Sequence, residues 1–439
     1  MFSTFVTIPK VDDAMLTPSL RMARIKQVFD VPPPIEDLPS AVSQALSPLK
    51  LTSRIRPGET VAITVGSRGI ANIATIVRAV IAELKSTGAT PFILPAMGSH
   101  GGATIKGQID VLRQLGVTPE TMGVPIRATM EVTQIGKVLG FPVYINKFGS
   151  KADHIAVVAR IKPHTDFKGD IESGFYKMMV VGLGNHKGAT AFHRASARHG
   201  HSKVLAKFGR TTLKNTNIAF GLGIVENAYD QTVRIEAASP SNMEQTEKKL
   251  LRQSKSWMMK LPFNDADVLI VDELGKDISG DGMDPNVTGR FGPSLSGSYG
   301  PRISRIVVLD LTHKTHGNAL GIGKADFTTK RAVEKMDRHL TYINALTALD
   351  PAGAKIPPYF DNDRETVSAA VNSILTPPNR LKAIRIKNTL ALGEVEISEA
   401  YLPLLKNRKD LFLTREPKRL TFDRDGNLPP FQFQTGLGT

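Results

Sequence analysis

The sequence predicts an α/β protein of two domains, each built around a mainly parallel sheet. A chain of 439 residues exceeds what one hydrophobic core usually supports. Strand-like and helix-like patterns alternate along the chain, which is typical of parallel sheets covered by helices. A new strand pattern also begins at residue 267, after the turn Pro262-Phe-Asn-Asp265. We therefore expect an N-terminal domain over residues 1–258 and a C-terminal domain over residues 259–439.

The N-terminal domain contains two consecutive strand–turn–helix units. Residues 61–65 form an apolar strand pattern that runs into Gly66-Ser67-Arg68-Gly69, and apolar residues then recur at helical spacing over 73–84. Residues 91–94 repeat the strand pattern before Gly98-Ser99-His100-Gly101-Gly102 and an amphipathic segment. Two such units in succession favour a parallel sheet.

The remaining elements follow from the same two periodicities. Ser241 and Glu244 have the spacing of a helix capping box, which predicts a helix from there to about Met258. Residues 279–290 are polar and glycine-rich, and we expect a mobile loop beside the cleft between the domains, with a plain connection as the alternative. The other expected strands lie at 141–145, 155–158, 218–220, 267–271, 306–309 and 383–386, and the other expected helices at 35–46, 189–198, 328–340 and 365–375.

The composition excludes several classes of protein. The chain has no cysteine, which removes disulfides, thiolate nucleophiles, Cys-ligated zinc and iron–sulfur clusters. The amino terminus lacks the basic region, apolar stretch and cleavage site of a signal peptide, and no segment has the pattern of a membrane span. We therefore expect a cytoplasmic protein without a membrane partner.

The charge of the chain points to anionic ligands. Lys and Arg number 56 against 41 Asp and Glu, which gives a net charge of +15. No helix-turn-helix, zinc-finger or RNA-recognition signature accompanies this charge, so we do not expect nucleic-acid binding as the main function. Small carboxylates and phosphates remain candidate ligands.

Polar side chains follow three predicted strands at the edge where open α/β sheets bind ligands. Ser67, Arg68 and Gly69 follow the first strand and supply a hydroxyl, a guanidinium and backbone N–H groups, which suit a phosphate or carboxylate. His100 follows the second strand, and His164 follows the strand over 155–158. Imidazole acts as an acid or base near neutral pH. Each turn alone also fits a purely structural role, and it is their convergence that indicates a site.

Residues 173–201 carry the densest group of chemically useful side chains. Ser173-Gly174-Phe175-Tyr176-Lys177 leads into a glycine-rich stretch, and seven of the ten histidines lie between His100 and His201. Such clustering suggests metal or proton chemistry. Helical spacing over 189–198 presents His193 on one face. We expect surface positions for His186, His199 and His201, and a structural or peripheral role for His313 and His316.

Together these motifs resemble the nickel-pincer-nucleotide-dependent lactate racemase superfamily. The order is Gly-Ser-Arg, Gly-Ser-His, Pro-His and Ser-Gly-Phe-Tyr-Lys, with a Gly five residues and a His sixteen residues beyond the Lys. The resemblance runs through most of residues 55–340. It implies an isomerase, a racemase or epimerase that inverts C2 of a 2-hydroxy acid.

The resemblance implies a specific cofactor. This is a pyridinium-3-thioamide-5-thiocarboxylic acid mononucleotide, joined through a thioacyl link to Lys177 and carrying nickel, for which His193 is the protein ligand. Ser67 and Gly69 are the other implied cofactor-binding residues. Lysine supplies a nucleophilic amine, and neutral imidazole is a good nickel ligand where thiolates are absent. The proteins that make the cofactor are implied partners.

The resemblance also implies how the reaction proceeds. His100 and His164 match the two acid/base histidines, and Arg68 matches the arginine that binds the substrate carboxylate. One histidine removes the hydroxyl proton while hydride leaves C2 for the pyridinium carbon. The resulting 2-keto acid receives hydride on its other face and is thereby inverted.

Two departures from the lactate racemase pattern affect the expected substrate. Glu273, followed three residues later by Lys276, stands where lactate racemases are expected to have an amide, and both match substrate-facing positions. A carboxylate repels a second carboxylate but accepts hydrogen bonds from hydroxyl groups. The stretch from His164 to Lys177 is also three residues longer than expected. We therefore expect a sugar acid such as an aldonate.

Other functions remain open at this point. The same sheet edges also fit a conventional nicotinamide- or metal-dependent oxidoreductase. The positive charge alone also fits a protein that binds phosphate ligands or nucleic acid. A covalent nucleotide adduct distinguishes the racemase from both.

Overall fold

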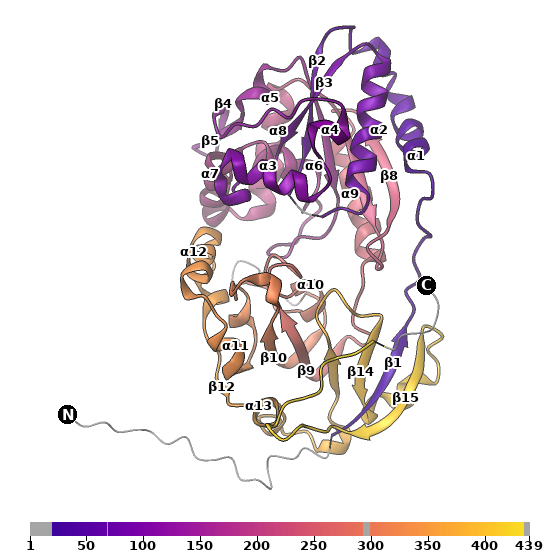
Figure 1. Cartoon of the computed structure of the whole chain (residues 1–439), viewed down its shortest axis with the longest axis vertical. Coiled ribbons are helices and arrows are strands. Elements are labelled where there is room, and N and C mark those ends of the chain that lie inside the picture. The colour runs from indigo at the N-terminus through magenta and orange to yellow at the C-terminus, as the bar shows by residue number, and fades with distance from the viewer. Residues whose placement is uncertain (1–19, 68, 293–298, 434–439) are drawn as a thin grey trace, which may run out of the picture. The chain divides into compact units, whose positions relative to one another are not determined.

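The computed structural model describes residues 20–67, 69–292 and 299–433 of the chain (Figure 1). These residues form two compact units. The first unit comprises residues 31–258, and the second comprises residues 20–30 together with 259–433.

A five-stranded sheet forms the centre of the first unit. Its strand order is β3-β2-β6-β7-β8, and neighbouring strands are parallel except for the antiparallel pair β7 and β8. The strands are β2 (Thr60–Val65), β3 (Thr90–Pro95), β6 (His154–Arg160), β7 (Ile218–Glu226) and β8 (Thr232–Ala238). Because β3, β2 and β6 are neighbours with the same direction, their carboxyl ends lie at one edge of the sheet.

Helices and one hairpin complete the first unit. The hairpin pairs β4 (Val132–Val138) with β5 (Phe141–Asn146). The short helix α6 (Phe175–Lys177) continues into a π-helical turn, η4 (Met178–Gly182). The other helices are α1 (Leu38–Leu46), α2 (Ile73–Ser86), α3 (Ile105–Gln114), α4 (Pro119–Met122), α5 (Lys147–Lys151), α7 (Asn185–His199), α8 (His201–Asn215) and α9 (Met243–Trp257).

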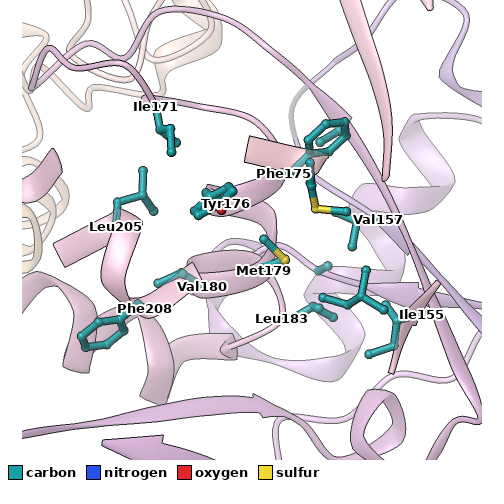
Figure 2. Close-up of a cluster of buried hydrophobic side chains, with 14 of the residues drawn as sticks. Ile155, Val157, Ile171, Phe175, Tyr176, Met179, Val180, Leu183, Leu205 and Phe208 are labelled. Atoms are coloured by element: carbon teal, nitrogen blue, oxygen red, sulfur yellow. The ribbon is translucent and has the colours of Figure 1, made fainter. Parts of the chain in front are cut away.

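The alternation of side chains along each strand divides the core of the first unit into two layers. Val61 and Ile63 of β2 pack with α1 and α2 on one face of the sheet. Residues of β6 with the opposite orientation, Ile155 and Val157, pack with α6, α8 and α9 on the other face. Figure 2 shows part of this second layer, in which α6 and η4 lie among the buried side chains. The sheet therefore fixes the position of the segment that contains Lys177.

An eight-stranded sheet forms the centre of the second unit, in the order β12-β11-β10-β9-β13-β14-β1-β15. Pairs from β12 to β13 are parallel, and pairs from β13 to β15 are antiparallel. The strands are β1 (Arg21–Gln27), β9 (Asp265–Leu274), β10 (Arg302–Leu311), β11 (Phe327–Thr329), β12 (Tyr359–Phe360), β13 (Ala383–Ile386), β14 (Glu394–Ser398) and β15 (Leu411–Arg419). The helices are α10 (Pro285–Thr288), α11 (Lys330–Glu334), α12 (Arg338–Ala348), α13 (Asp363–Asn372) and α14 (Leu402–Leu405).

The assignment of residues 20–30 to the N-terminal domain is wrong. Strand β1 pairs with β14 on one side, where Met22 lies opposite Ser398, and with β15 on the other. Its main-chain hydrogen bonds are therefore made with strands from the far end of the chain. The expected boundary between residues 258 and 259 coincides with the division between the two units.

Two local expectations in the second unit also differ from the structure. The helix expected over 328–340 is divided, because Thr329 caps the start of α11 and Asp337 caps the start of a separate helix, α12. The polar stretch over 279–290 is packed rather than loose. Ser279, Asp281 and Asp284 in it are buried, and Asp281 pairs with Lys324 at 2.5 Å.

The expected fold class is confirmed, because both units are α/β and their sheets are mainly parallel. Among the described residues, every helix is too short or too polar to cross a membrane.

Candidate active site

Some of the predicted site residues lie in three turns at one edge of the first-unit sheet. Ser67 follows β2, His100 follows β3, and His164 lies beyond β6. The side-chain oxygen of Ser67 is hydrogen-bonded to Nδ1 of His100, which is exposed. Gly69 is exposed, and a side chain there would meet no neighbour. Arg68, the predicted carboxylate-binding residue, lies outside the described residues.

The position of Lys177 is set by close packing on both sides of α6. A Cβ at Gly174, just before the helix, would lie 2.7 Å from Oε1 of Glu247, so a side chain there would require the buried Glu247 to shift. Phe175 and Tyr176 are buried in the core that Figure 2 shows. Lys177 follows them and is partly exposed. The helix then widens into the π-helical turn η4, a feature often found at functional sites.

The two glycine-rich turns pack against η4, the turn that follows Lys177. A Cβ at Gly66 would lie 3.1 Å from the terminal methyl of Met178. Gly98 adopts a left-handed conformation with φ of +61°, and a Cβ on it would lie 3.2 Å from Val181. The N–H of Gly98 also donates to the carbonyl of Gly182. The segment after Lys177 is therefore in contact with the turns that carry Ser67 and His100.

Lys177 and His164 are in direct contact. Nζ of Lys177 lies 2.7 Å from Nε2 of His164. The other ring nitrogen, Nδ1, accepts a hydrogen bond from the N–H of Asp166 at 3.0 Å. The imidazole also stacks on Phe167, with ring centroids 4.4 Å apart. Burial, followed by the nearby charge of Lys177, lowers the pKa of His164 well below its ordinary value, so the ring is neutral at pH 7.

His193 and His201 lie beside this pair, and we call His164, His193 and His201 the histidine cluster. The ring centroids of His193 and His201 are 6.4 Å apart. His201 stacks on Phe167 at 5.3 Å, so the ring of Phe167 contacts both His164 and His201. Burial lowers the pKa of His193 to about 4, and burial together with Lys177 lowers the pKa of His201. The cluster therefore presents neutral imidazoles, the form that binds metals.

The expected surface position of His201 is wrong, whereas His186 lies on the surface as expected. His201 is partly buried in the histidine cluster rather than on the surface. His186 is exposed, as expected, and His199 is partly buried with its ring edge-on to Phe141. His313 and His316 lie in the second unit with ring centroids 6.4 Å apart. Among the described residues, no three His, Asp or Glu side chains are arranged to hold a metal ion.

Glu172 fixes the backbone of His164. Its fully buried carboxylate accepts hydrogen bonds from the N–H groups of His164 at 2.8 Å and Gly169 at 3.0 Å. Nζ of Lys255, on α9, donates to the same carboxylate at 2.6 Å. These partners offset the cost of a buried charge. The long stretch between His164 and Lys177 is thus folded around one carboxylate, which the sequence analysis did not identify.

Glu247 and Glu244 of α9 hold the segment that carries Lys177. Glu247 is fully buried and accepts a hydrogen bond from the N–H of Tyr176 at 2.9 Å. Glu244 accepts one from the Tyr176 hydroxyl at 3.0 Å and pairs with Arg210. The capping box expected for Glu244 is therefore absent, since its carboxylate is used elsewhere. Helical spacing places Glu247 on the apolar face of α9, a signal that the sequence analysis overlooked.

We predict that replacing Glu247 with Gln makes stability less sensitive to pH. Burial raises the pKa of Glu247 to about 8, against 4.5 ordinarily, so between these values the folded state keeps a proton that the unfolded state has lost. The stability of the parent protein therefore falls as pH rises from about 5 to 8. Glutamine has no proton to lose. Urea midpoints at pH 5, 6.5 and 8 measure the difference, and parallel pH profiles for Glu247→Gln and parent would contradict the prediction.

The two predicted specificity residues lie in the second unit. Glu273 is on β9, opposite Asp310 of β10, and is partly buried. Lys276 lies just beyond β9, where its N–H donates to Oγ1 of Thr315 at 3.0 Å and its Nζ to the carbonyl of Gly280. Their place at the carboxyl end of a parallel strand is one where α/β sheets bind ligands.

The first-unit arrangement combines an amine with several imidazoles. An amine held 2.7 Å from a ring nitrogen is placed for covalent chemistry under the control of that ring. A neutral, partly buried imidazole such as His193 is placed to bind a metal. A second imidazole at the sheet edge, His100, is accessible to a proton-exchanging ligand.

Comparison with known proteins agrees with this arrangement. Residues 14–204 match the family model of the lactate racemase N-terminal domain. The fold resembles that of a Thermotoga maritima protein solved by a structural genomics consortium and that of the lactate racemase apoprotein from Thermoanaerobacterium thermosaccharolyticum. Sequence identity is 13% and the TM-score 0.50 in both cases, with 82% and 84% of this chain and 99% of each other chain covered. No curated protein matches the chain.

The structural likeness, at this identity, shows the fold alone. The likeness in sequence is confined to residues 14–204, which include Ser67, His100, His164, Lys177 and His193. Over residues 14–204 the chain is therefore similar to the lactate racemase N-terminal domain.

Proposed function

We propose that this protein is a nickel-pincer-nucleotide-dependent racemase or epimerase that inverts C2 of a 2-hydroxy acid. The match of residues 14–204 to the lactate racemase N-terminal domain supports the reaction class. The observation that carries the proposal is the direct contact between Lys177 and His164 beside His193. It brings a candidate tethering amine, a candidate acid/base and a candidate metal ligand into one part of the first unit.

The residues present fit such a cofactor. Lys177 offers an amine for a thioacyl link, and His193 offers a neutral imidazole for nickel. Ser67 and Gly69, in the turn after β2, offer a hydroxyl and backbone N–H groups to a nucleotide phosphate. When bound, the nucleotide would take hydride from C2 and return it. Proteins that synthesise the nucleotide are the partners this proposal requires.

His100 and His164 serve in the proposal as the two acid/base groups. His100 is fixed through its Nδ1 by Ser67, and His164 is fixed through its Nδ1 by the N–H of Asp166. Nε2 of His164 contacts Nζ of Lys177. In an inversion, each histidine acts as base toward one enantiomer and as acid toward the other. Arg68 is the proposed carboxylate-binding residue.

Intact-mass measurement tests the proposal. The protein is produced with and without the enzymes that make the nucleotide. Its mass is measured under conditions that leave the thioacyl link intact. We expect a covalent adduct only in the first preparation, located on Lys177 by peptide mapping. An unchanged mass in active, purified enzyme would reject the proposal in favour of a conventional oxidoreductase.

We predict that His193→Ala keeps the organic adduct but loses nickel. The imidazole is the only protein ligand that the proposal gives to the metal, whereas the covalent link depends on Lys177. Nickel content per adduct, from elemental analysis and intact mass on the same sample, measures the effect. His186→Ala is the matched control, because this exposed histidine on the same helix should leave nickel unchanged. Equal nickel in His193→Ala and parent would remove His193 from the ligand set.

We propose a sugar acid, such as an aldonate, as the substrate. Glu273 is an acceptor that substrate hydroxyl groups satisfy and a methyl group does not. Lys276 supplies a donor to a substrate oxygen, for which its Nζ must exchange its bond to the carbonyl of Gly280. Leaving a buried acceptor unpaired costs about 1–3 kcal/mol, and more if it is charged. This cost disfavours short acids such as lactate.

We predict that Glu273→Gln reduces turnover of an aldonic acid more than turnover of lactate. The substitution weakens an acceptor that only the polyhydroxy acid uses. The ratio of kcat/KM for gluconate and lactate, measured on enzyme with equal adduct content, reports the change. Parent enzyme that racemises lactate as well as it epimerises gluconate would show that Glu273 is not a specificity residue.

A further inference from the structure

A single carboxylate joins three neighbouring elements at the edge of the first-unit sheet where the strand-end turns lie. Glu226 is the last residue of β7, and its side chain is 8% exposed. Its Oε1 accepts a hydrogen bond from the N–H of Ala71 at 2.6 Å, and its Oε2 accepts one from the guanidinium of Arg160 at 2.5 Å. Ala71 lies in the turn between β2 and α2, and Arg160 is the last residue of β6. Glu226 therefore connects β7 both to this turn and to the end of β6.

Ala71 is held through its carbonyl as well as through its N–H. Thr232, the first residue of β8, donates from Oγ1 to the carbonyl of Ala71 at 3.2 Å. Thr232 is buried and lies opposite Glu226 in the pairing of β7 with β8. Both polar groups of the Ala71 backbone are therefore bonded to side chains of one pair of strands, which fixes this point of the turn.

The turn after β2 depends on such external contacts for its shape. Within its described residues, 66–67 and 69–72, no main-chain hydrogen bond links one turn residue to another, although the N–H of Ile73 donates to the carbonyl of Ile70 at 3.2 Å. Asn72 has a left-handed backbone with φ of +61°, and its side chain makes no cap hydrogen bond to α2. A conformation of this kind persists where the surrounding structure enforces it.

The other end of the turn carries Ser67, whose side-chain oxygen is hydrogen-bonded to Nδ1 of His100. The side chain of His100 is exposed, so packing orients its ring less than packing orients a buried ring. The orientation of this ring therefore depends in part on where the turn places the Ser67 hydroxyl.

We propose that Glu226 is a positioning residue for His100. It fixes Ala71, and the fixed turn holds the Ser67 hydroxyl against the ring. A connection that is anchored near both ends has fewer conformations to lose when it presents a side chain. Arg160 keeps the carboxylate in place, because it pairs with the oxygen that does not bond to Ala71. The acid/base role of His100 rests on the proposed function, whereas the link from Glu226 to the ring does not.

Glu236 provides the matched control, since a purely structural role for Glu226 would affect stability alone. Glu236 lies on β8 of the same sheet and pairs with Arg234 at 2.8 Å and with Lys249 at 2.7 Å. Neither partner belongs to a turn at the edge that carries Ser67. Glu236→Ala therefore removes a paired carboxylate without changing a contact of the turn after β2.

Nitrogen-15 NMR of cofactor-free protein with labelled histidine tests the link. His100→Gln assigns the ring resonances of His100, and Ser67→Ala gives their positions when the hydroxyl is absent. We expect Glu226→Ala to move these resonances towards their Ser67→Ala positions, and Glu236→Ala to leave them at the parent positions. His100 resonances that stay at the parent positions in folded Glu226→Ala, or that move equally in Glu236→Ala, would overturn the inference.

A conservative double variant tests whether the bond to Ala71 carries the effect. Glu226→Gln combined with Arg160→Met removes the ion pair but keeps an acceptor for the N–H of Ala71. We expect the His100 resonances to return to the parent positions in this variant. Resonances displaced as far as in Glu226→Ala would show that the charge pair acts by another route, which would overturn the proposed link.

Thr232→Val serves where Glu226→Ala does not fold. Valine has nearly the shape of threonine but no hydroxyl, so this variant loses the bond to the carbonyl of Ala71 and keeps the packing. We expect the His100 resonances to move in the same direction as in Ser67→Ala. Unchanged resonances in Thr232→Val would then overturn the inference.

Turnover separates this inference from the proposed function. At equal adduct content we expect Glu226→Ala to lower kcat by at least about tenfold and Glu236→Ala to stay within about twofold, because misplacing a catalytic group by about 1 Å can cost about two orders of magnitude. The NMR experiment does not use the nucleotide. Displaced His100 resonances in a protein that forms no adduct would therefore reject the proposed function and leave the link from Glu226 to His100 in place.

Discussion

Lys177→Ala is expected to abolish both the nucleotide adduct and all turnover while leaving the fold intact. The side chain is partly exposed, so its removal costs little packing, and Phe175 and Tyr176 still hold the segment in the core. Intact mass measures the adduct, and circular dichroism measures the melting midpoint. Loss of turnover is complete in this prediction because hydride has no acceptor when the tether is missing.

The control for this variant is Lys207→Ala. Lys207 is exposed on α8, in the same unit, and lies outside the proposed site. It should form the adduct and turn over as the parent does. A Lys177→Ala protein that still carries a nickel-containing adduct would show that the tether is elsewhere.

His100→Ala and His164→Ala are each expected to reduce turnover by about two to four orders of magnitude, the usual range for general acid–base catalysis. The effect of His164→Ala is expected to be the larger of the two, because that ring also contacts Lys177. Rates are measured in both directions of inversion and divided by adduct content, so that a loading defect is separated from a catalytic one.

Two further observations check this second prediction. Exposed His186, replaced by Ala, should leave the rate unchanged. In heavy water the product should contain little deuterium at C2, because the hydrogen at that carbon returns as hydride rather than as a solvent proton. Rapid incorporation of deuterium at C2 would indicate enolisation and would overturn the hydride mechanism.

The sequence predicted those parts of the fold that local patterns encode. Residues 61–65 and 91–94 have strand patterns, and residues 73–84 between them have helical spacing. The structure has β2, β3 and α2 at these places. Ser67 and His100 were also expected to lie together, because both follow neighbouring parallel strands, and the structure shows them hydrogen-bonded. Their roles, and those of Lys177 and His193, stay predictions.

The parts that were missed depend on contacts between distant residues. His201 has the local context of a surface residue, and only the packing of α8 against Phe167 brings it into the histidine cluster. Glu172 looks like one more polar residue in a loop, although it organises that loop from its buried position. Glu247 is different, since its place on the apolar face of α9 was readable from the helical period.

The position of β1 has a consequence for the order in which the protein folds during synthesis. Residues 21–27 leave the ribosome well before β14 and β15, between which they lie. At ordinary translation rates the strand waits on the order of tens of seconds for a partner. The strands of the five-stranded sheet all lie within residues 31–258, so that unit is complete while the strand still waits. Deletion of residues 21–27 is therefore expected to damage the second unit and to leave the first unit, residues 31–258, intact.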